Sequence, residues 1–486
     1  MNVFILVVCF GSALAFPFEI NVNWPFIVAD EHTSNMEAFF KDQKIQAEKA
    51  FTSSIEEARR MKNSVFSYFE DKQRQFSDDL NDYVESVKES GRKFSDSWSF
   101  LQREDAGDRM ENPDIVLSVP SIIIRNVYPC ETHIVMSQGY LLNIHRIPRS
   151  KNGGGIPRKT IILHHGLFAS SADWILNGPE KSLAYILADA GYDVWMPNIR
   201  GNKYSREHAW LKTNSKSFWN FSWHDVAVYD VPAIIDYILK EKGEGTKVTY
   251  IGHSMGTTIL FAMLTMRPEY NDILTAGFAL APVVFLSDIK TPIKSLSKVA
   301  SNVAQMEMLY GSYEFIPKNS VLGKMTKSCD VDGRDAAVCK NLLFYICGYN
   351  EKQFNKTLLP IFLSHIGTGT SWKTAVHFAQ EVVAGGKFQQ FDYGSDLNLR
   401  VYGNEAPPEY DLDKIKLPLT LFWAENDLLS SEADVKDLYK RLPPTTQIYK
   451  ISDPDFNHLD YLWAIDAPTL FTDKILFYLK QVYSTL

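Results

Sequence analysis

The sequence predicts an α/β protein with a mostly parallel central sheet, an inserted segment and a helical N-terminal extension. Over residues 111–285, short apolar stretches alternate with helical stretches, which is the pattern of parallel strands joined by helices. The alternation breaks over residues 286–410 (hereafter the insert) and resumes over residues 411–486. Residues 16–110 instead carry apolar residues at helical spacing. A chain of 486 residues, 45% of them hydrophobic, can bury one large core and still carry an extra module.

A catalytic serine is predicted at Ser254 by the motif G-x-S-x-G over residues 252–256. The motif follows a β-branched stretch at 247–251 and precedes an apolar stretch at 257–266 that lacks Gly and Pro. Strand, sharp turn and helix in this order form the nucleophile elbow of α/β-hydrolases, whose strained turn needs glycines where the chain passes close to itself. The alternative is a plain glycine-rich turn, and the flanking elements favour the catalytic interpretation.

The two partners that a serine nucleophile needs are expected downstream, in the order acid and then histidine. Residues 417–423 predict a strand, and Asp427 follows it as the candidate orienting carboxylate, with Glu425 as its nearest competitor. Residues 447–452 predict the last strand, and His458 follows it as the candidate general base.

An oxyanion hole is expected where the apolar strand at 161–165 runs into Gly166. In this fold one donor is the backbone N–H after the nucleophile, here Met255, and the other comes from the loop after an early strand, here Leu167. Backbone amides are the donors, so the side chains of His164 and His165 are interpreted as packing beside the turn.

Short motifs shared with one family run from Asn112 to the C-terminus. They are Asn112–Asp114, Tyr128–Glu131, Gly139–Leu142, Ser171–Trp174, Leu187–Trp195, Asn198–Asn202, Phe218–Ser222, Tyr229–Ala233, Ala279–Pro282 and Asn457–Asp460. In this combination the chain resembles the animal acid lipase family, which includes the gastric and lysosomal acid lipases. The resemblance implies an α/β-hydrolase fold, a lipase activity and a triad of Ser254, Asp427 and His458.

The same resemblance implies that the insert is the family's cap and lid, which would bury acyl chains and exclude water. Two departures from the family pattern are visible. The family usually has Gln where this chain has Met255, and residues 16–110 have no counterpart in the compact members.

The N-terminus predicts a secretory signal peptide at residues 1–15, with an apolar segment at 3–10 and an A-x-A site before Phe16. We therefore expect a secreted enzyme, extracellular or in a gut lumen, with the lysosome as the alternative. Two N-x-[ST] sequons, at Asn220 and Asn355, are candidate glycosylation sites. Asn355 is preferred because Asn220 lies inside an aromatic motif that favours packing.

Four cysteines remain after removal of the signal peptide: Cys130, Cys329, Cys339 and Cys347. They allow three pairings. Spacing favours a local Cys329–Cys339 bridge, and the family's cap bridge resembles that pairing and leaves Cys347 free. A zinc site is the rival interpretation, but the chain does not have two C-x-x-C or C-x-x-H motifs that could pair to hold the ion.

The extension at 16–110 predicts one long amphipathic helix, or two broken near Gly91. Its apolar positions are Phe51, Ile55, Ala58, Val65, Phe69, Phe76, Leu80, Val87, Phe94, Trp98 and Leu101. Packing of this stripe on the hydrolase body or on itself is one interpretation, and docking on lipid droplets or lipoprotein surfaces is another. A cleaved propeptide and a coiled-coil dimer are weaker alternatives, since the heptads are not strict.

The predicted function is a secreted serine lipase that cleaves neutral lipids, triacylglycerols or sterol esters, through an acyl-enzyme at an oil–water interface. No metal or cofactor is implied, and the net charge of −8 argues against a nucleic-acid partner. A carboxylesterase acting on smaller esters is the runner-up. A lipid-binding or storage protein that kept the fold and lost turnover is the rival from another class, and the oligomeric state is left open.

Overall fold

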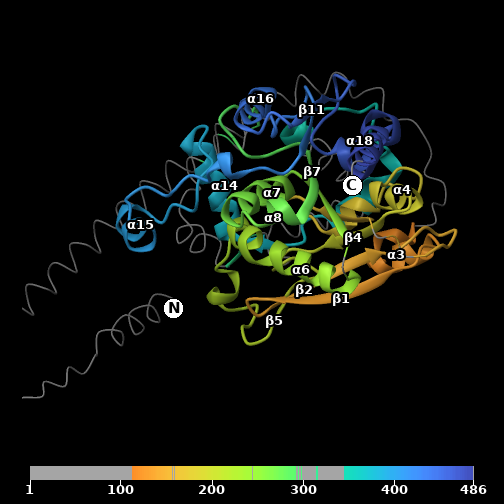
Figure 1. Cartoon of the computed structure of the whole chain (residues 1–486), viewed down its shortest axis with the longest axis horizontal. Helices are drawn as coiled ribbons and strands as arrows, with labels where there is room; N and C mark the ends of the chain where they lie inside the picture. Colours follow the sequence, from red (N-terminus) through yellow and green to blue (C-terminus); the bar gives the residue numbers. More distant parts are fainter. Residues whose placement is uncertain are drawn as a thin grey trace, which may run out of the picture. The chain divides into compact units, whose positions relative to one another are not determined.

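The computed structural model describes residues 112–155, 157, 159–243, 245–291, 294, 297, 313–315 and 344–484 (Figure 1). These residues form a nine-stranded sheet in the order β1-β2-β4-β3-β6-β7-β10-β11, with β5 pairing β2 off this path. The strands are β1 (Glu131–Ser137), β2 (Tyr140–Ile147), β3 (Lys159–His164), β4 (Asp193–Pro197), β5 (Glu207–His208), β6 (Lys247–His253), β7 (Leu274–Leu280), β10 (Leu419–Trp423) and β11 (Gln447–Lys450). The pairings from β4 through β11 are parallel and those of β1, β2 and β5 are antiparallel, so the predicted α/β class with a mostly parallel sheet is confirmed.

Strand register brings the carboxyl ends of the parallel strands to one edge of the sheet. His164 at the end of β3 pairs with Gly252 in β6, and His253 at the end of β6 pairs with Leu280 in β7. Leu280 pairs in turn with Phe422 in β10. Loops that leave these four strands therefore start side by side, where open α/β sheets usually place their sites.

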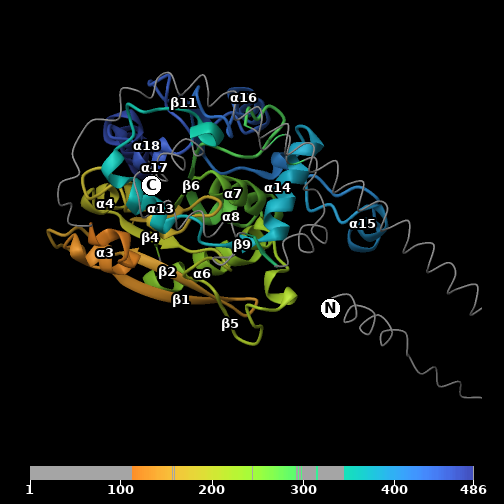
Figure 2. The same ribbon diagram turned by 180° about the vertical axis from the view of Figure 1, so that it is seen from behind.

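Helices cover both faces of this sheet (Figures 1 and 2). The helices of the described residues are α3 (Val119–Arg125), α4 (Leu183–Asp189), α5 (Trp223–Asp225), α6 (Val231–Lys242), α7 (Met255–Met266), α8 (Tyr270–Ile273), α13 (Leu359–His365), α14 (Trp372–Ala384), α15 (Ser395–Tyr402), α16 (Glu432–Arg441), α17 (Asp460–Trp463) and α18 (Asp473–Ser484), and α15 lies away from the sheet. Short 3₁₀ or π turns are η2 (Pro113–Ile115), η3 (Ser171–Trp174), η4 (Lys216–Trp219), η5 (Val226–Asp230), η6 (Lys356–Leu358), η7 (Leu412–Lys414) and η8 (Pro468–Thr472). Among the described residues, no helix is both long and apolar enough to cross a membrane.

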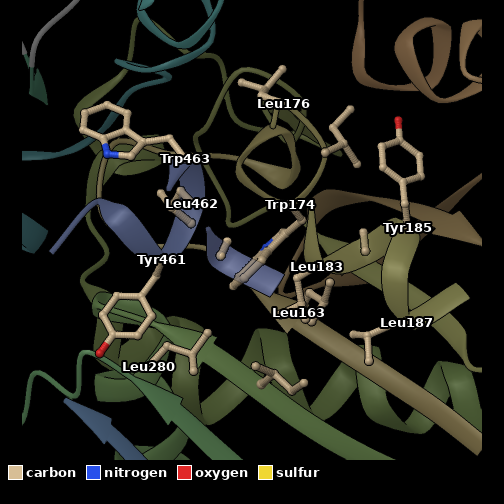
Figure 3. Close-up of a cluster of buried hydrophobic side chains, with 14 of the residues drawn as sticks. Leu163, Trp174, Leu176, Leu183, Tyr185, Leu187, Leu280, Tyr461, Leu462 and Trp463 are labelled. Atoms are coloured by element: carbon tan, nitrogen blue, oxygen red, sulfur yellow. The ribbon is translucent and has the colours of Figure 1, made fainter. Parts of the chain in front are cut away.

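The two faces carry two separate cores, because successive side chains of a strand point to opposite sides. Ile161 and Leu163 of β3 join the core under α4 and α18, whereas Ile162 between them joins the core under α6 and α7. Figure 3 shows part of the first core, where Leu163 and Leu280 of the sheet lie with Trp174. Strands buried on both faces read as continuous apolar runs, which is why they could be predicted from the sequence.

The insert separates two adjacent strands, since β7 ends at Leu280, β10 begins at Leu419 and the two pair directly. Within the insert, β8 (Glu314–Phe315) and β9 (Thr370–Ser371) form a second, two-stranded sheet. The domain boundaries proposed from the sequence stay a prediction. The signal peptide at 1–15 and the extension at 16–110 lie outside the described residues.

The preference for Asn355 over Asn220 rested on an expected packing of Asn220, and this expectation is wrong. Asn220 is exposed between the buried Trp219 and Phe221, because the two rings turn inward and the amide turns out. Asn355 is only half-exposed, and its Oδ1 accepts hydrogen bonds from the N–H and the hydroxyl of Thr357. Burial therefore gives no reason to prefer Asn355, and glycosylation at either sequon stays a prediction.

The cysteine expectations are tested in part. Cys347 is buried and free of a disulfide, as expected, and Cys130 is also free. The predicted partners Cys329 and Cys339 lie outside the described residues, so their bridge stays a prediction.

A buried ion-pair cluster at the start of β4 provides a test of the fold. Asp193 is fully buried and accepts two hydrogen bonds from Arg146 (2.8 and 2.9 Å) and one from Lys242 (2.5 Å). We expect Asp193→Asn to lower the free energy of unfolding by about 3–5 kcal/mol, because Lys242 and Arg146 lose a buried counter-ion and Arg146 keeps the half-exposed Glu131, at 2.7 Å. Asp437→Asn is the matched control, since its pair with Arg441 is largely exposed and contributes about 0.5 kcal/mol or less. Urea unfolding at pH 7 measures both, and equal losses would contradict the account.

Candidate active site

The turn between β6 and α7 holds Ser254 in a strained backbone conformation. Its φ of 53° is a value that residues other than glycine rarely adopt. A Cβ atom on Gly252 would lie 2.7 Å from the Gly256 carbonyl, and one on Gly256 would overlap the His164 carbonyl oxygen. Both glycines are therefore required by close approach of the backbone, as the motif predicts.

The structure brings Ser254, His458 and Asp427 into one hydrogen-bonded line. Nδ1 of His458 lies 2.9 and 3.1 Å from the two carboxylate oxygens of Asp427, and Nε2 lies 2.8 Å from Oγ of Ser254. An ionised carboxylate can only accept, so Nδ1 carries the proton and Nε2 is left to accept from the serine hydroxyl. Asp427 and His458 are both buried, and this arrangement can withdraw a proton from Ser254.

Asp427 is selected over Glu425 by the geometry of the loop after β10. Oδ1 of Asp427 also accepts the N–H groups of Leu429 (2.9 Å) and Ser430 (2.8 Å), which orient the carboxylate toward His458. Glu425 is exposed and pairs with Lys450 at 2.6 Å. It therefore lies outside the hydrogen-bonded line.

His253, in the motif at residues 252–256, forms a hydrogen bond with the loop that carries His458. Nε2 of His253 lies 2.8 Å from the backbone carbonyl oxygen of His458. A carbonyl oxygen can only accept, so Nε2 is the donor. Burial, and then the neighbouring His458, lower the pKa of His253 to about 3. The ring is therefore neutral in weak acid and keeps its proton on the nitrogen that faces the carbonyl.

Asp460 organises the same loop from the other side. Oδ2 accepts the N–H of Asn457 (2.8 Å) and the amide of Asn350 (2.9 Å), and Oδ1 accepts the indole N–H of Trp463 (2.8 Å). Burial raises the pKa of Asp460 to about 7, and these three donors act against that shift. Three donors on one buried carboxylate restrict the position of the loop that carries His458.

One stretch of the insert, residues 347–350, contacts both the loop of Asp427 and the loop of His458. The N–H of His458 donates to the Cys347 carbonyl at 3.2 Å, and the side chain of Asn426 donates to the Tyr349 carbonyl at 2.8 Å. Asn350 adds its bond to Asp460. The insert thus holds both loops through direct hydrogen bonds.

Two backbone donors lie beside the nucleophile. A Cβ on Gly166 would lie 3.1 Å from the Cβ of Ser254, so the turn after β3 abuts the serine. In the described part of the chain, the N–H groups of Leu167 and Met255 make no hydrogen bond. The Met255 side chain is buried in the core under α7, so the departure from the family's Gln leaves an apolar contact there and keeps the backbone donor.

The two histidines before this turn are buried, and burial lowers the pKa of His164 to about 3 and of His165 to about 4. Nε2 of His165 accepts the N–H of Ile199 (3.3 Å), and its Nδ1–H donates to the Gly166 carbonyl (2.8 Å). Their surroundings fit the packing role expected from the sequence. Over the residues that the structure describes, no group of three or more His, Cys, Asp or Glu side chains is placed to hold a metal ion.

Several supporting residues were missed by the sequence reasoning. His253 and Asp460 lie inside motifs that were recognised, so their positions could have been flagged. Nothing in the local sequence indicates that Asn350 reaches the histidine loop, because that contact joins residues more than a hundred positions apart.

Comparisons with known proteins place the chain in a family. Residues 119–178 match a model described as a partial alpha/beta-hydrolase lipase region, and residues 159–332 match one described as the alpha/beta hydrolase fold. Lipase 3 of Drosophila melanogaster is 39% identical over 361 residues, which cover 74% of this chain and 90% of that protein. Gastric triacylglycerol lipase of Homo sapiens is 38% identical over 363 residues, with 74% and 89% covered. Lysosomal acid lipase/cholesteryl ester hydrolase of Macaca fascicularis is 34% identical over 387 residues, with 78% and 96% covered.

The fold and the site define an α/β-hydrolase. Within that class, the chain belongs to the acid lipase family of carboxylic ester hydrolases, together with the gastric and lysosomal enzymes.

Asp173 lies in η3, a few residues after the turn at Gly166–Leu167. The side chain is buried, Oδ2 has no partner within the described part, and burial raises the pKa to about 8. Between about pH 4 and pH 8 the folded state binds a proton that the unfolded state has lost, so stability falls as pH rises, by up to about 1.4 kcal/mol per unit.

Asp173→Asn mimics the neutral acid and removes this dependence. We expect similar free energies of unfolding for wild type and variant at pH 4.5, and a more stable variant at pH 7.5, in denaturant titrations. Parallel pH profiles of the two proteins would contradict a buried, unpaired carboxyl at this position.

Proposed function

We propose that the chain hydrolyses carboxylic esters of neutral lipids, triacylglycerols or sterol esters, with Ser254 as the nucleophile. The observation that carries the proposal is the line Asp427–His458–Ser254, beside the N–H groups of Leu167 and Met255, which have no partner among the residues that the structure describes. The substrate class rests on the relatives, since a gastric triacylglycerol lipase and a lysosomal acid lipase/cholesteryl ester hydrolase align over most of their length.

In the first half of the reaction, Oγ of Ser254 attacks the ester carbonyl carbon while Nε2 of His458 takes the hydroxyl proton. Asp427 keeps the ring in orientation and stabilises the imidazolium that forms. The negative charge that develops on the carbonyl oxygen is held by the N–H groups of Leu167 and Met255, and each such donor is typically worth about 3–4 kcal/mol.

The tetrahedral intermediate then collapses. The bond to the alcohol oxygen breaks, His458 returns its proton to that oxygen, and an acyl ester on Ser254 remains. A water molecule, activated by the same Nε2, attacks the acyl carbon, and the fatty acid leaves as Ser254 recovers its proton.

The insert supports a lipid substrate rather than a small soluble ester. It is placed between β7 and β10, and its residues 347–350 contact the catalytic loops. We infer that it serves as the cap of the site and shields the acyl chain from water. The hydrogen-bonded arrangement of Asp427, His458 and Ser254 also argues against a storage protein without turnover, because lipid binding alone does not require it.

We infer secretion into the extracellular space or a gut lumen, with the lysosome as the alternative. The inference rests on residues 1–15 and on the gastric and lysosomal relatives.

The function is tested on two substrates, emulsified triolein and a soluble short-chain nitrophenyl ester. We expect the wild type to hydrolyse both and Ser254→Ala to lose a factor of about 10⁴ or more on each, since the remaining site lacks its nucleophile. Ser364→Ala in α13 is the control, because among the described residues its hydroxyl bonds only to Ile361 of its own helix. Hydrolysis of the soluble ester alone would favour a carboxylesterase, and activity on neither would favour a lipid-binding protein.

A matched pair of carboxylate variants tests the assignment of the acid. We expect Asp427→Asn to lower kcat by about 10³–10⁴, because an amide cannot hold the imidazolium or its tautomer in the same way. Glu425→Gln, two positions away, should change kcat less than about twofold, since its exposed pair with Lys450 is a surface contact. Similar losses in the two variants would sink the assignment.

A further inference from the structure

A second stretch of the insert grips the turn that carries the Leu167 N–H. The N–H groups of Gly367 and Thr368 both donate to the carbonyl oxygen of Phe168, at 2.9 and 3.1 Å. The hydroxyl of Thr368 donates to the carbonyl oxygen of Ala169 at 2.6 Å. Three hydrogen bonds from two consecutive residues therefore converge on the two residues that follow Leu167.

The backbone at this contact is unusual on both sides. Phe168 has a φ of 61°, which side-chain-bearing residues rarely adopt and which persists where the surroundings over-determine it. Thr368 lies between Gly367 (φ 70°) and Gly369 (φ 92°), and glycine adopts such values without steric cost. Gly367, whose dihedral angles set the relative direction of these two N–H groups, allows both to face one carbonyl.

The ring of Phe168 is held as well. Its centroid lies 5.1 Å from that of Phe315 in β8, and Phe315 lies edge-on at 4.3 Å to Trp372 at the start of α14. Phe315 of the two-stranded sheet thus restrains the ring of Phe168, and the Thr368 hydroxyl restrains the backbone of Ala169.

The other end of the turn is restrained by the core of the protein. His165 donates to the Gly166 carbonyl at 2.8 Å, and Gly166 abuts Ser254. Leu167 lies between these two restrained ends. The position of its N–H relative to Ser254 therefore depends on the contacts made by the insert as well as on β3.

We propose that Thr368 is a positioning residue for the oxyanion hole, through which the insert holds the Leu167 N–H at the distance from Ser254 that the transition state requires. The inference rests on the proposed roles of Ser254 and of the Leu167 amide. Small displacements matter here, because a misplacement of about 1 Å can cost two orders of magnitude in rate. In addition to serving as the cap, the insert then positions a group of the catalytic site.

The test uses a pair of substitutions at one position. Thr368→Val keeps the shape and removes the hydroxyl, whereas Thr368→Ser keeps the hydroxyl and removes a methyl group. Thr265→Val is the matched control, since Thr265 is also buried and donates to a carbonyl, that of Ala262 at 2.9 Å, toward the far end of α7 from Ser254.

Rates on the soluble nitrophenyl ester are divided by the number of sites titrated with a phosphonate, so that only folded enzyme is counted. We expect Thr368→Val to lower kcat about tenfold with KM little changed. The reason is that the Leu167 N–H binds the oxyanion, which forms only in the transition state, so its displacement affects the rate and not substrate binding. Thr368→Ser should recover most of the loss, and Thr265→Val should stay within about twofold of the parent.

The inhibition constant of a trifluoromethyl ketone provides a second measurement. It would not change if Thr368 only stabilised the fold. This inhibitor forms a tetrahedral adduct whose oxyanion occupies the hole, so its inhibition constant should rise for Thr368→Val by the same factor as kcat/KM falls.

An unchanged kcat and inhibition constant per titrated site in Thr368→Val would overturn the inference, even if the variant melts at a lower temperature. An equal loss in Thr265→Val would overturn it too. Activity that survives Ser254→Ala would instead overturn the proposed function, so the two failures are distinguishable.

Discussion

The close approach of the turn at Ser254 to the end of β3 is the constraint on which the site depends. Gly256 leaves no room for a side chain against the His164 carbonyl, and Gly166 lies against the Cβ of Ser254. Gly256 at the start of α7 and Gly166 after β3 therefore allow Ser254 and the turn at Gly166–Leu167 to lie side by side. Ser254 itself has a strained φ of 53°, and its hydroxyl lies 2.8 Å from Nε2 of His458 on the loop after β11.

The sheet alone does not position the rest of the machinery. Asp427 and His458 lie on loops, and loops need partners for their backbone groups if a hydrogen bond of 2.8 Å is to be maintained. Neutral His253 supplies one partner from the elbow, and the buried Asp460 another. The insert supplies further partners through two short stretches, 347–350 and 367–368, that reach different parts of the site.

Much of this could be predicted from the sequence, because its signals are local. Parallel strands buried on both faces appear as apolar runs, the elbow needs small residues at set positions, and chain order alone placed Asp427 and His458 after the correct strands. The sequence leaves Glu425 as a competitor of Asp427, and only the loop after β10 separates their surroundings: two N–H groups orient Asp427 toward His458, whereas Glu425 pairs with Lys450.

Other features depend on contacts between distant segments and leave no local signal. The roles of Asn350 and Thr368 fall in this group, as does the unpaired burial of Asp173. Asn220 shows the limit of reasoning from neighbours, since an exposed residue can lie between two buried rings when the chain turns its side chains alternately.

The central claim is that Ser254 is the nucleophile activated by His458 and Asp427. Its most direct measurement is covalent trapping: the protein is treated with a long-chain alkyl nitrophenyl phosphonate, digested and sequenced by mass spectrometry. The account predicts one adduct per chain, on the peptide that contains Ser254, with ester hydrolysis lost in proportion to labelling. An adduct on another residue, or hydrolysis that persists after Ser254 is fully labelled, would contradict it.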